Sequence, residues 1–335
     1  MARQSRPRLI DVARDSKVSL ATASRALAQP ELVNETTLER ILASAERLGY
    51  LASRTIPASR SGARFIGAVV PTIDNTVFSH TLEAMQARLA KFGCQLFVAT
   101  TGYSSAAETE ALRSLLARDV DGIILVGAAR LPEAIRLLEE AGVPVVLTWV
   151  ADERFDAVAI DNALAGRLAA RHLLDLGHTR IGVVTGRLNN NDRQQLRVDG
   201  VRAELVEAGL ALPEWRISQQ PYTLAGGRAG CATLLSLADA PTAIICGIDI
   251  QAFGCLVEAH SRGLRVPEEL SLVGIDDIEM SAHMSPALTT VHISTATIGE
   301  CAADKLMARL DGRQVERITE LPIELVVRQS TAALR

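Results

Sequence analysis

From residue 65 onward the chain alternates between short apolar segments and longer amphipathic ones, and this alternation limits its fold more than any other feature. Val, Ile and Leu fill the short segments without a break, which is typical of strands buried on both faces in parallel sheets covered by helices. We predict strands at residues 65–71, 95–100, 122–127, 143–149, 157–160, 181–185, 243–246, 270–275 and 323–327, and helices at 78–92, 106–118, 131–141, 163–176 and 193–208. This region is long enough for two sheets, so we predict an α/β body with two similarly built lobes that face a cleft.

The first part of the chain has a different pattern. Within residues 9–27, two short helical stripes are separated by a polar break at 15–17, and Ser19 is a good N-cap for the second stripe. A third amphipathic segment at 35–48 can bury the backs of both. Two short helices joined by a tight turn form the helix-turn-helix unit, whose second helix lies in the major groove of DNA. An ordinary pair of surface helices is the alternative, and the third segment favours the helix-turn-helix.

The outward face of the second predicted helix suits contact with DNA. Its candidate contact residues are Ser19, Leu20, Ala21, Thr22, Ser24 and Arg25. The hydroxyl groups can reach phosphate oxygens, and Arg25 can pair with guanine O6 and N7. Leu20 and Ala21 can contact only apolar groups such as the thymine methyl.

Charge is distributed unevenly along the chain. The net charge is −4, which alone argues against a nucleic-acid partner. Residues 1–64, however, hold 11 basic and six acidic residues, whereas the remainder holds 24 basic and 33 acidic ones. A basic head on an acidic body is typical of a small DNA-binding domain joined to a domain that does not bind DNA.

Several classes of protein are excluded by what the sequence lacks. It has no apolar run near the roughly 20 residues of a membrane span and no signal-peptide segment, so we expect a cytoplasmic protein with no membrane partner. The five cysteines and six histidines are scattered without metal-ligand spacing. There is no nucleotide-binding Gly-rich loop and no nucleophile elbow. We therefore expect no metal, no cofactor and no enzymatic activity.

Taken together, these segments resemble the lactose-repressor (LacI/GalR) family of bacterial transcription regulators. The resemblance is carried by residues 10–13, 18–19, 22, 24–25, 49–50, 287–291 and 298–299. It implies a DNA-binding domain at 1–50, a hinge linker at 51–64, and an effector-binding and dimerisation domain at 65–335. Within that domain, lobe one is 65–161 with 292–321, and lobe two is 162–291 with 322–335. The implied function is that of a repressor that binds double-stranded operator DNA as a homodimer and responds to a small sugar or sugar acid.

Two positions depart from the family pattern. The family's linker forms a hinge helix on DNA and inserts a leucine into the minor groove. Here Pro57 interrupts that helix and Ser59 lies about where the leucine is expected, which leaves Ile56 to wedge a base step. Lys17 occupies a turn position where the family usually has Gly or Asn, and a positive φ there would cost Lys about 1 kcal/mol more than Gly.

Ligands of parallel α/β sheets bind beyond the carboxyl ends of the strands. The candidates found there are Asp74, Asn75, Phe78, Trp149, Asp161, Arg193, Arg197, Tyr222, Asp249 and Asp276. Arg, Asp and aromatic side chains are the groups that hold polyols. Arg197 and Asp276 match effector-binding positions of the family, and Arg193 is a candidate clamp for a carboxylate. Asp161 and Asp249 have an alternative role as helix N-caps.

A further similarity within the family suggests a first candidate for the effector. Residues 71–75, 101–103 and 148–149 are similar to the gluconate-type branch of the family, which favours gluconate. Two other interpretations stay open on the sequence, a cytoplasmic sugar-binding protein and a sugar-modifying enzyme. The basic head argues against the first, and the lack of an acid/base or nucleophile constellation argues against the second.

Overall fold

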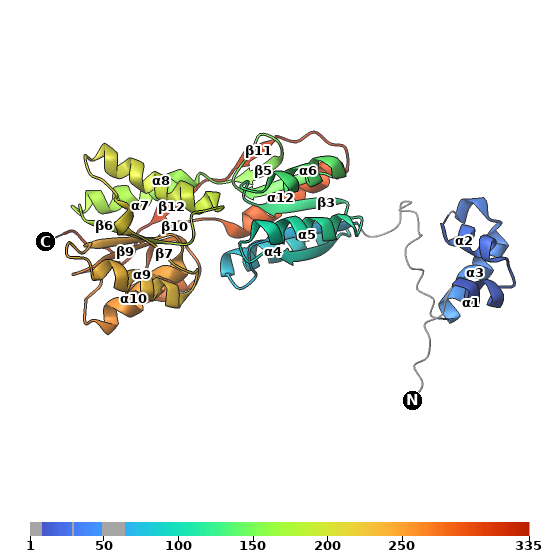
Figure 1. The fold of residues 1–335 in the computed structure, drawn as a ribbon, viewed down its shortest axis with the longest axis horizontal. Helices are drawn as coiled ribbons and strands as arrows, with labels where there is room; N and C mark the ends of the chain where they lie inside the picture. The colour runs from blue at the N-terminus through green and yellow to red at the C-terminus, as the bar shows by residue number, and fades with distance from the viewer. Residues whose placement is uncertain (1–8, 29, 49–63, 335) are drawn as a thin grey trace, which may run out of the picture. The chain divides into compact units, whose positions relative to one another are not determined.

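The computed structural model describes residues 9–28, 30–48 and 64–334. The chain divides into two compact units, Met1–Ala63 and Arg64–Arg335 (Figure 1). The linker residues Ile56, Pro57 and Ser59 lie outside the described residues, so the predictions made for them stay predictions.

The first unit is a three-helix head. It contains α1 (Leu9–Asp15), α2 (Leu20–Ala28), a short 3₁₀ helix (Pro30–Leu32) and α3 (Glu35–Arg47). Its buried core contains Val12 of α1, Ala26 of α2, and Ile41 and Ala45 of α3. In the turn between α1 and α2, Lys17 has φ +53°, which is the conformation that makes Lys costly at this position.

Lobe one of the second unit has a six-stranded parallel sheet in the order β11-β5-β4-β3-β1-β2. Its strands are β1 (Phe65–Val70), β2 (Gln95–Thr100), β3 (Gly122–Val126), β4 (Val145–Trp149), β5 (Asp156–Ala159) and β11 (Ile318–Glu320). The helices α4 (Thr76–Ala90) and α12 (Thr295–Leu310) pack together on one face, and α5 (Ser105–Leu116) and α6 (Pro132–Ala141) pack on the other (Figure 1). Both faces are covered, which explains the unbroken apolar strands.

Lobe two repeats this plan. Its sheet has the order β12-β10-β9-β8-β6-β7, with β12 antiparallel to β10 and the remaining pairs parallel. The strands are β6 (Ile181–Thr185), β7 (Ile217–Gln219), β8 (Ala243–Cys246), β9 (Ser271–Asp276), β10 (Thr289–His292) and β12 (Glu324–Val326). The helices are α7 (Asn162–Asp175), α8 (Asp192–Glu207), α9 (Leu224–Leu235), α10 (Asp249–Ser261) and the short α11 (Met280–His283), with a 3₁₀ helix at Glu214–Arg216.

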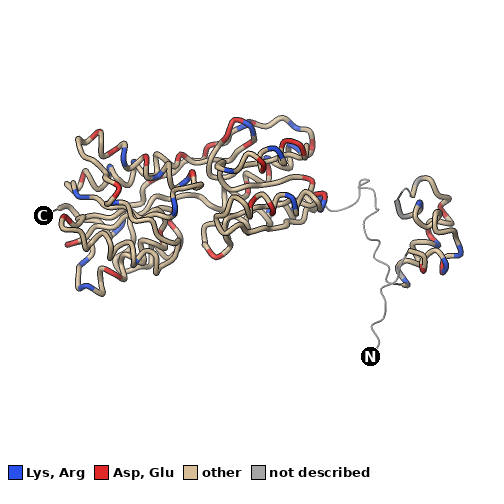
Figure 2. Tube along the Cα trace, in the orientation of Figure 1, with Lys and Arg blue, Asp and Glu red and all other residues tan. Residues whose placement is uncertain are grey.

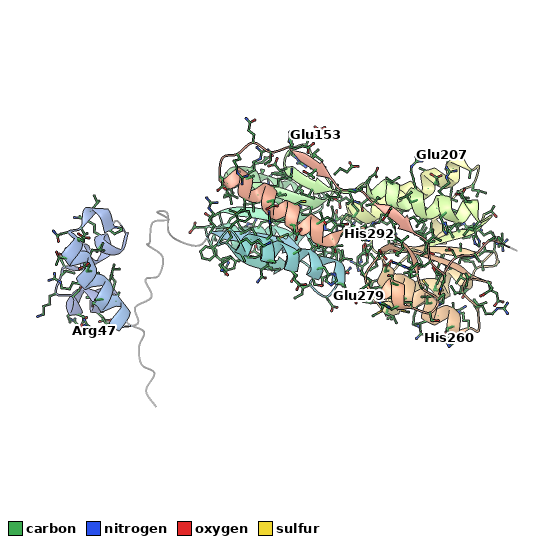
Figure 3. The ribbon with its side chains drawn as sticks, turned by 180° about the vertical axis from the view of Figure 1, so that it is seen from behind. Arg47, Glu153, Glu207, His260, Glu279 and His292 are labelled. Atoms are coloured by element: carbon green, nitrogen blue, oxygen red, sulfur yellow. The ribbon has the colours of Figure 1, made fainter. Side chains whose placement is uncertain are left out.

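The chain passes between the lobes at three places. These are the connections β5 to α7, β10 to α12, and β11 to β12. His292, which ends β10, lies at one of them (Figure 3). The α/β fold class with two parallel-sheet lobes and a helical head is therefore confirmed. The strands β10 and β11 are absent from the predicted set, because each contains a single apolar residue, Val291 in β10 and Ile318 in β11, and so leaves no apolar run.

Candidate functional site

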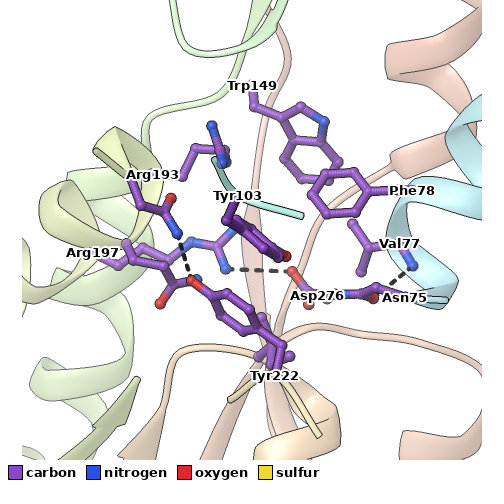
Figure 4. Close-up of a pocket in the computed structure, with 12 residues that line it drawn as sticks. Asn75, Val77, Phe78, Tyr103, Trp149, Arg193, Arg197, Tyr222 and Asp276 are labelled. Carbon is purple, nitrogen blue, oxygen red and sulfur yellow. Dashed lines mark hydrogen bonds and ion pairs between the residues drawn. The ribbon is translucent and has the colours of Figure 1, made fainter. Parts of the chain in front are cut away.

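A cavity lies between the two lobes, beyond the carboxyl ends of their strands, and the space left free inside it is about 30 Å³ (Figure 4). Its lining residues are Asn75, Val77, Phe78, Tyr103, Trp149, Asn191, Arg193, Gln194, Arg197, Tyr222, Ile248 and Asp276. Both lobes contribute side chains, so a ligand held here would contact both.

Seven of the ten candidate effector residues line this cavity, and three lie outside it. Asp161 is exposed, and its carboxylate caps α7 by accepting from the Leu164 backbone N–H at 2.8 Å. Asp74 is exposed in the loop before α4. Asp249 is fully buried and accepts from the Ser281 and Thr290 hydroxyls and from a backbone N–H. Its carboxylate therefore ties α10 to the neighbouring strand and loop rather than facing the cavity.

Arg197 and Asp276 form the buried charged centre of the cavity. The Arg197 guanidinium donates to the Gly247 carbonyl at 2.7 Å and to Asn162 Oδ1 at 3.1 Å, and its Nη1 lies 3.5 Å from Asp276 Oδ1 (Figure 4). Burial raises the pKa of Asp276 to about 8, because the loss of water outweighs the opposing charge of Arg197. Burial also lowers the pKa of Arg197. Groups desolvated to this degree gain much from a ligand that hydrogen-bonds to them.

The position of Arg197 depends on the close approach of α7 and α8. A Cβ atom at Gly166 would lie 1.9 Å from the Arg197 carbonyl oxygen. Only glycine lets the two helix backbones come this near, and that contact sets where the Arg197 side chain enters the cavity.

Aromatic rings form the walls of the cavity. Phe78 and Trp149 meet edge to face with centroids 6.1 Å apart, and Tyr103 of lobe one lies 4.9 Å from Tyr222 of lobe two. Within the described part of the chain, the buried Trp149 Nε1 has no hydrogen-bond partner. Asn191 Nδ2 donates to the Tyr222 hydroxyl at 2.5 Å, while the buried Asn191 Oδ1 also lacks a partner among the described residues. Both unpaired atoms belong to residues that line the cavity.

The ten candidates do not include five lining residues, namely Val77, Tyr103, Asn191, Gln194 and Ile248. Tyr103 follows the strand predicted at 95–100, so the rule about strand ends could have found it. Gln194 lies three residues before Arg197 on α8 and therefore shares its helix face. It accepts from the Thr185 hydroxyl at 2.6 Å.

The second candidate surface is the outward face of α2. Ser19, Leu20, Ala21, Ser24 and Arg25 are exposed, whereas Thr22 is half-buried. The Ser19 hydroxyl accepts from the Thr22 backbone N–H at 3.0 Å and lies 2.7 Å from the Thr22 hydroxyl. Ser19 therefore caps α2 as predicted. Figure 2 marks the basic residues of this unit, which include Arg25 on α2.

Two negative findings concern only the described residues. They contain no group of three or more His, Cys, Asp or Glu side chains arranged to hold a metal ion. A search of the same residues finds no helix with the length and apolar character needed to cross a membrane.

A helix-turn-helix head together with a two-lobed body that encloses a polar, aromatic-walled cavity defines the class of ligand-responsive DNA-binding proteins. Residues 8–53 match the model for bacterial regulatory proteins of the lacI family, and residues 170–331 match the periplasmic binding protein-like domain. The chain belongs to the lacI family. It is a DNA-binding transcriptional regulator and not an enzyme, which confirms both predictions.

The similarity to individual relatives extends over nearly the whole chain. The chain is 34% identical to an uncharacterised HTH-type transcriptional regulator of Streptomyces limosus, covering 97% of this chain and 95% of that one. It is 30% identical to the ribose operon repressor of Haemophilus influenzae, covering 97% and 98%. The crystal structure of the transcription regulator GntR from Chromobacterium violaceum superposes with a TM-score of 0.76 at 30% identity, covering 80% of this chain and 99% of that one.

Proposed function

We propose that this protein is a homodimeric repressor whose effector is a small polyhydroxylated acid, with gluconate as the first candidate. The observation that carries the proposal is the charge of the cavity. Arg193 and Arg197 face a single acidic lining residue, Asp276, whose pKa is raised to about 8. A cavity with two guanidinium groups and one carboxyl stays positively charged in either protonation state of Asp276, which favours an anion, and a guanidinium binds a carboxylate through two parallel hydrogen bonds.

The remaining lining residues favour hydroxyl groups and a small carbon skeleton. The unpaired Trp149 Nε1 can donate to a hydroxyl oxygen, and Asn191 Oδ1 can accept from a hydroxyl. The ring faces of Phe78 and Tyr222 suit C–H groups. The free space of about 30 Å³ is well below the roughly 300–1,000 Å³ usual for ligand sites, so a ligand enters only when the lobes open or the lining side chains shift, which favours a small one.

The names of the similar proteins do not identify the effector of this chain. One is named for a ribose operon, another is named GntR, and both are 30% identical to this chain. The preference for a sugar acid therefore depends on the residues of the cavity.

Calorimetry tests the effector site. We expect D-gluconate to bind more tightly than neutral D-glucose or D-ribose. Arg197→Ala should weaken the binding of gluconate by about 2–5 kcal/mol, because it removes a guanidinium that pairs with the ligand's carboxylate and leaves that charge buried without this partner. Operator binding without effector should stay near that of the wild type. Arg167→Ala is the matched control, since Arg167 lies on α7 and pairs with Glu204 and Glu207 outside the cavity. Equal affinity in wild type and Arg197→Ala would reject the site, and tighter binding of a purine would reject the ligand class.

An exposed apolar edge on lobe one supports the homodimer. On the edge strand β2, Phe97 and Val98 are 38% and 44% exposed, and Phe97 stacks on Phe65 at 5.1 Å. Ile73, nearby in the same surface groove as Val98, is 59% exposed. An apolar patch along an open sheet edge favours association with a second copy.

Light scattering during gel filtration tests this interface. Phe97→Asp should convert the dimer to a monomer and abolish operator binding, because a palindromic operator needs two heads. Val206→Asp is the control, since Val206 is an apolar surface residue, 62% exposed, on α8 of lobe two. A dimer that survives Phe97→Asp would place the interface elsewhere.

A further inference from the structure

One carboxylate joins the two lobes at the edge of the cavity. Asp192 is the first residue of α8 in lobe two, and its Oδ2 accepts from the backbone N–H groups of Ala128 and Ala129 at 2.5 and 2.8 Å. Both alanines belong to the loop that follows β3 of lobe one. Bonds from backbone N–H groups to a carboxylate are charge-assisted and stronger than neutral ones.

The other oxygen of the same carboxylate holds a cavity residue. Asp192 Oδ1 accepts from the Arg193 side chain at 2.9 Å and from the Arg193 backbone N–H at 2.8 Å. The two side chains are only 12% and 16% exposed, so water screens this pair weakly. Asp192 therefore contacts lobe one with one oxygen and orients a lining arginine with the other.

The receiving loop of lobe one is shaped for this contact. Gly127 has φ +75°, and a Cβ atom there would lie 2.1 Å from the Arg193 guanidinium and 2.8 Å from Asp192 Oδ1. Arg130, with a side chain only 1% exposed, donates to the Gly127 carbonyl at 3.0 Å and pairs with Glu108 at 2.9 Å. A loop fixed by a buried arginine presents its N–H groups at a constant position and loses little entropy on binding.

We propose that Asp192 is a positioning residue that couples closure of the two lobes to the orientation of Arg193 in the cavity. The contact with lobe one uses the protein's own atoms and does not depend on which ligand binds. The effect on ligand affinity rests on the proposed effector site. An anion bound to Arg193 and the closed arrangement of the lobes then stabilise each other, because both need Arg193 and Asp192 in this geometry.

If Asp192 only stabilised its own helix, α8, the expected exchange of the lobe-one amides would differ. An acidic residue in the first turn stabilises its own helix through the helix dipole. Such a role would leave the amides of lobe one unprotected, so hydrogen exchange at Ala128 and Ala129 separates the two roles.

The first experiment is amide exchange in the full-length protein without added ligand. Both amides should be protected in the wild type and should exchange about tenfold faster or more in Asp192→Ala, because each loses its charged acceptor. Asp192→Asn keeps one acceptor oxygen, so its rates should fall between the two. If Asp192→Ala does not fold, the exchange rates of Asp192→Asn alone test the proposal. Asp161→Ala is the matched control, since Asp161 also lies at a helix start but its carboxylate caps only α7. Unchanged rates in both Asp192 variants, or an equal increase in Asp161→Ala, would overturn the proposal.

The second experiment measures gluconate affinity in a double-mutant cycle. Asp192→Ala and Arg193→Ala should each weaken the binding of gluconate. The double variant should lose less binding free energy than the sum of the two single losses, because the two residues act as one unit. Additive losses would overturn the coupling. If gluconate binds neither the wild type nor any variant, the proposal of gluconate as effector is wrong. The exchange experiment then still tests whether Asp192 contacts lobe one.

Discussion

Gluconate affinity should rise with pH between pH 6 and pH 8, because an ionised Asp276 accepts hydroxyl groups of the ligand more strongly than the protonated acid does. Burial raises the pKa of this carboxyl to about 8, whereas the charge of Arg197 opposes the shift. Below pH 8 the free protein therefore holds mainly the protonated acid. A ligand that binds the ionised form must displace that proton, so binding weakens as the pH falls. The carboxyl group of gluconate stays ionised over this range and does not contribute to the change.

The size of the effect follows from the ionised fraction of Asp276. With a pKa of about 8, the ionised fraction is about 1% at pH 6, about 9% at pH 7 and about half at pH 8. The apparent Kd equals the intrinsic value divided by this fraction. Affinity should then increase about tenfold from pH 6 to pH 7, about fivefold from pH 7 to pH 8, and less than about twofold from pH 8 to pH 9.

Titration calorimetry in two buffers of different ionisation enthalpy provides the assay. At pH 7 the dependence of the observed enthalpy on buffer should report release of about 0.9 proton per site. Asp276→Asn is the control, since it should bind gluconate more weakly and with no dependence on pH over this range. A flat affinity from pH 6 to pH 8 would refute the reasoning. No proton release at pH 7, together with proton uptake at pH 9, would show instead that Asp276 acts as a protonated donor.

Three further predictions concern the head, the turn and the body. Arg25→Ala should weaken specific operator binding by about 1–3 kcal/mol and relax the preference at one base pair, measured by fluorescence anisotropy on operator variants; equal losses on specific and random DNA would limit Arg25 to phosphate contact. Lys17→Gly should stabilise the isolated head by up to about 1 kcal/mol in thermal unfolding, because Lys17 has φ +53°. An unchanged melting temperature would contradict that strain. Asp249→Ala should destabilise residues 65–335 by at least about 1–3 kcal/mol in urea, since it leaves buried donors without an acceptor, and a neutral result would contradict its structural role.

The sequence predicted much of the cavity because parallel sheets place all their strand ends at one edge. Arg197 and Asp276 could be identified from that rule and from the family resemblance together. The same rule could not separate Asp249 from Asp276, since each stands at the end of a strand. The difference arises because Gly274 leaves room for Asp249 Oδ1, which a Cβ atom would approach to 2.1 Å, and because Ser281 and Thr290 occupy its oxygens. These partners are distant in the sequence and leave no local pattern.

Residues that act across the lobes were the hardest to predict, and they bear most directly on how the protein responds to a ligand. Arg193 was identified as a candidate clamp for a carboxylate, but nothing in the sequence near Asp192 reveals that its carboxylate meets the backbone of Ala128 and Ala129. Backbone donors carry no side-chain signature, so any residue type at those two positions except proline could supply them. The outward face of α2, which we propose contacts DNA, depends in contrast on the spacing within one helix and could be predicted locally. Recognition of DNA is therefore encoded in short segments, whereas the coupling of the two lobes depends on contacts that exist only in the folded body.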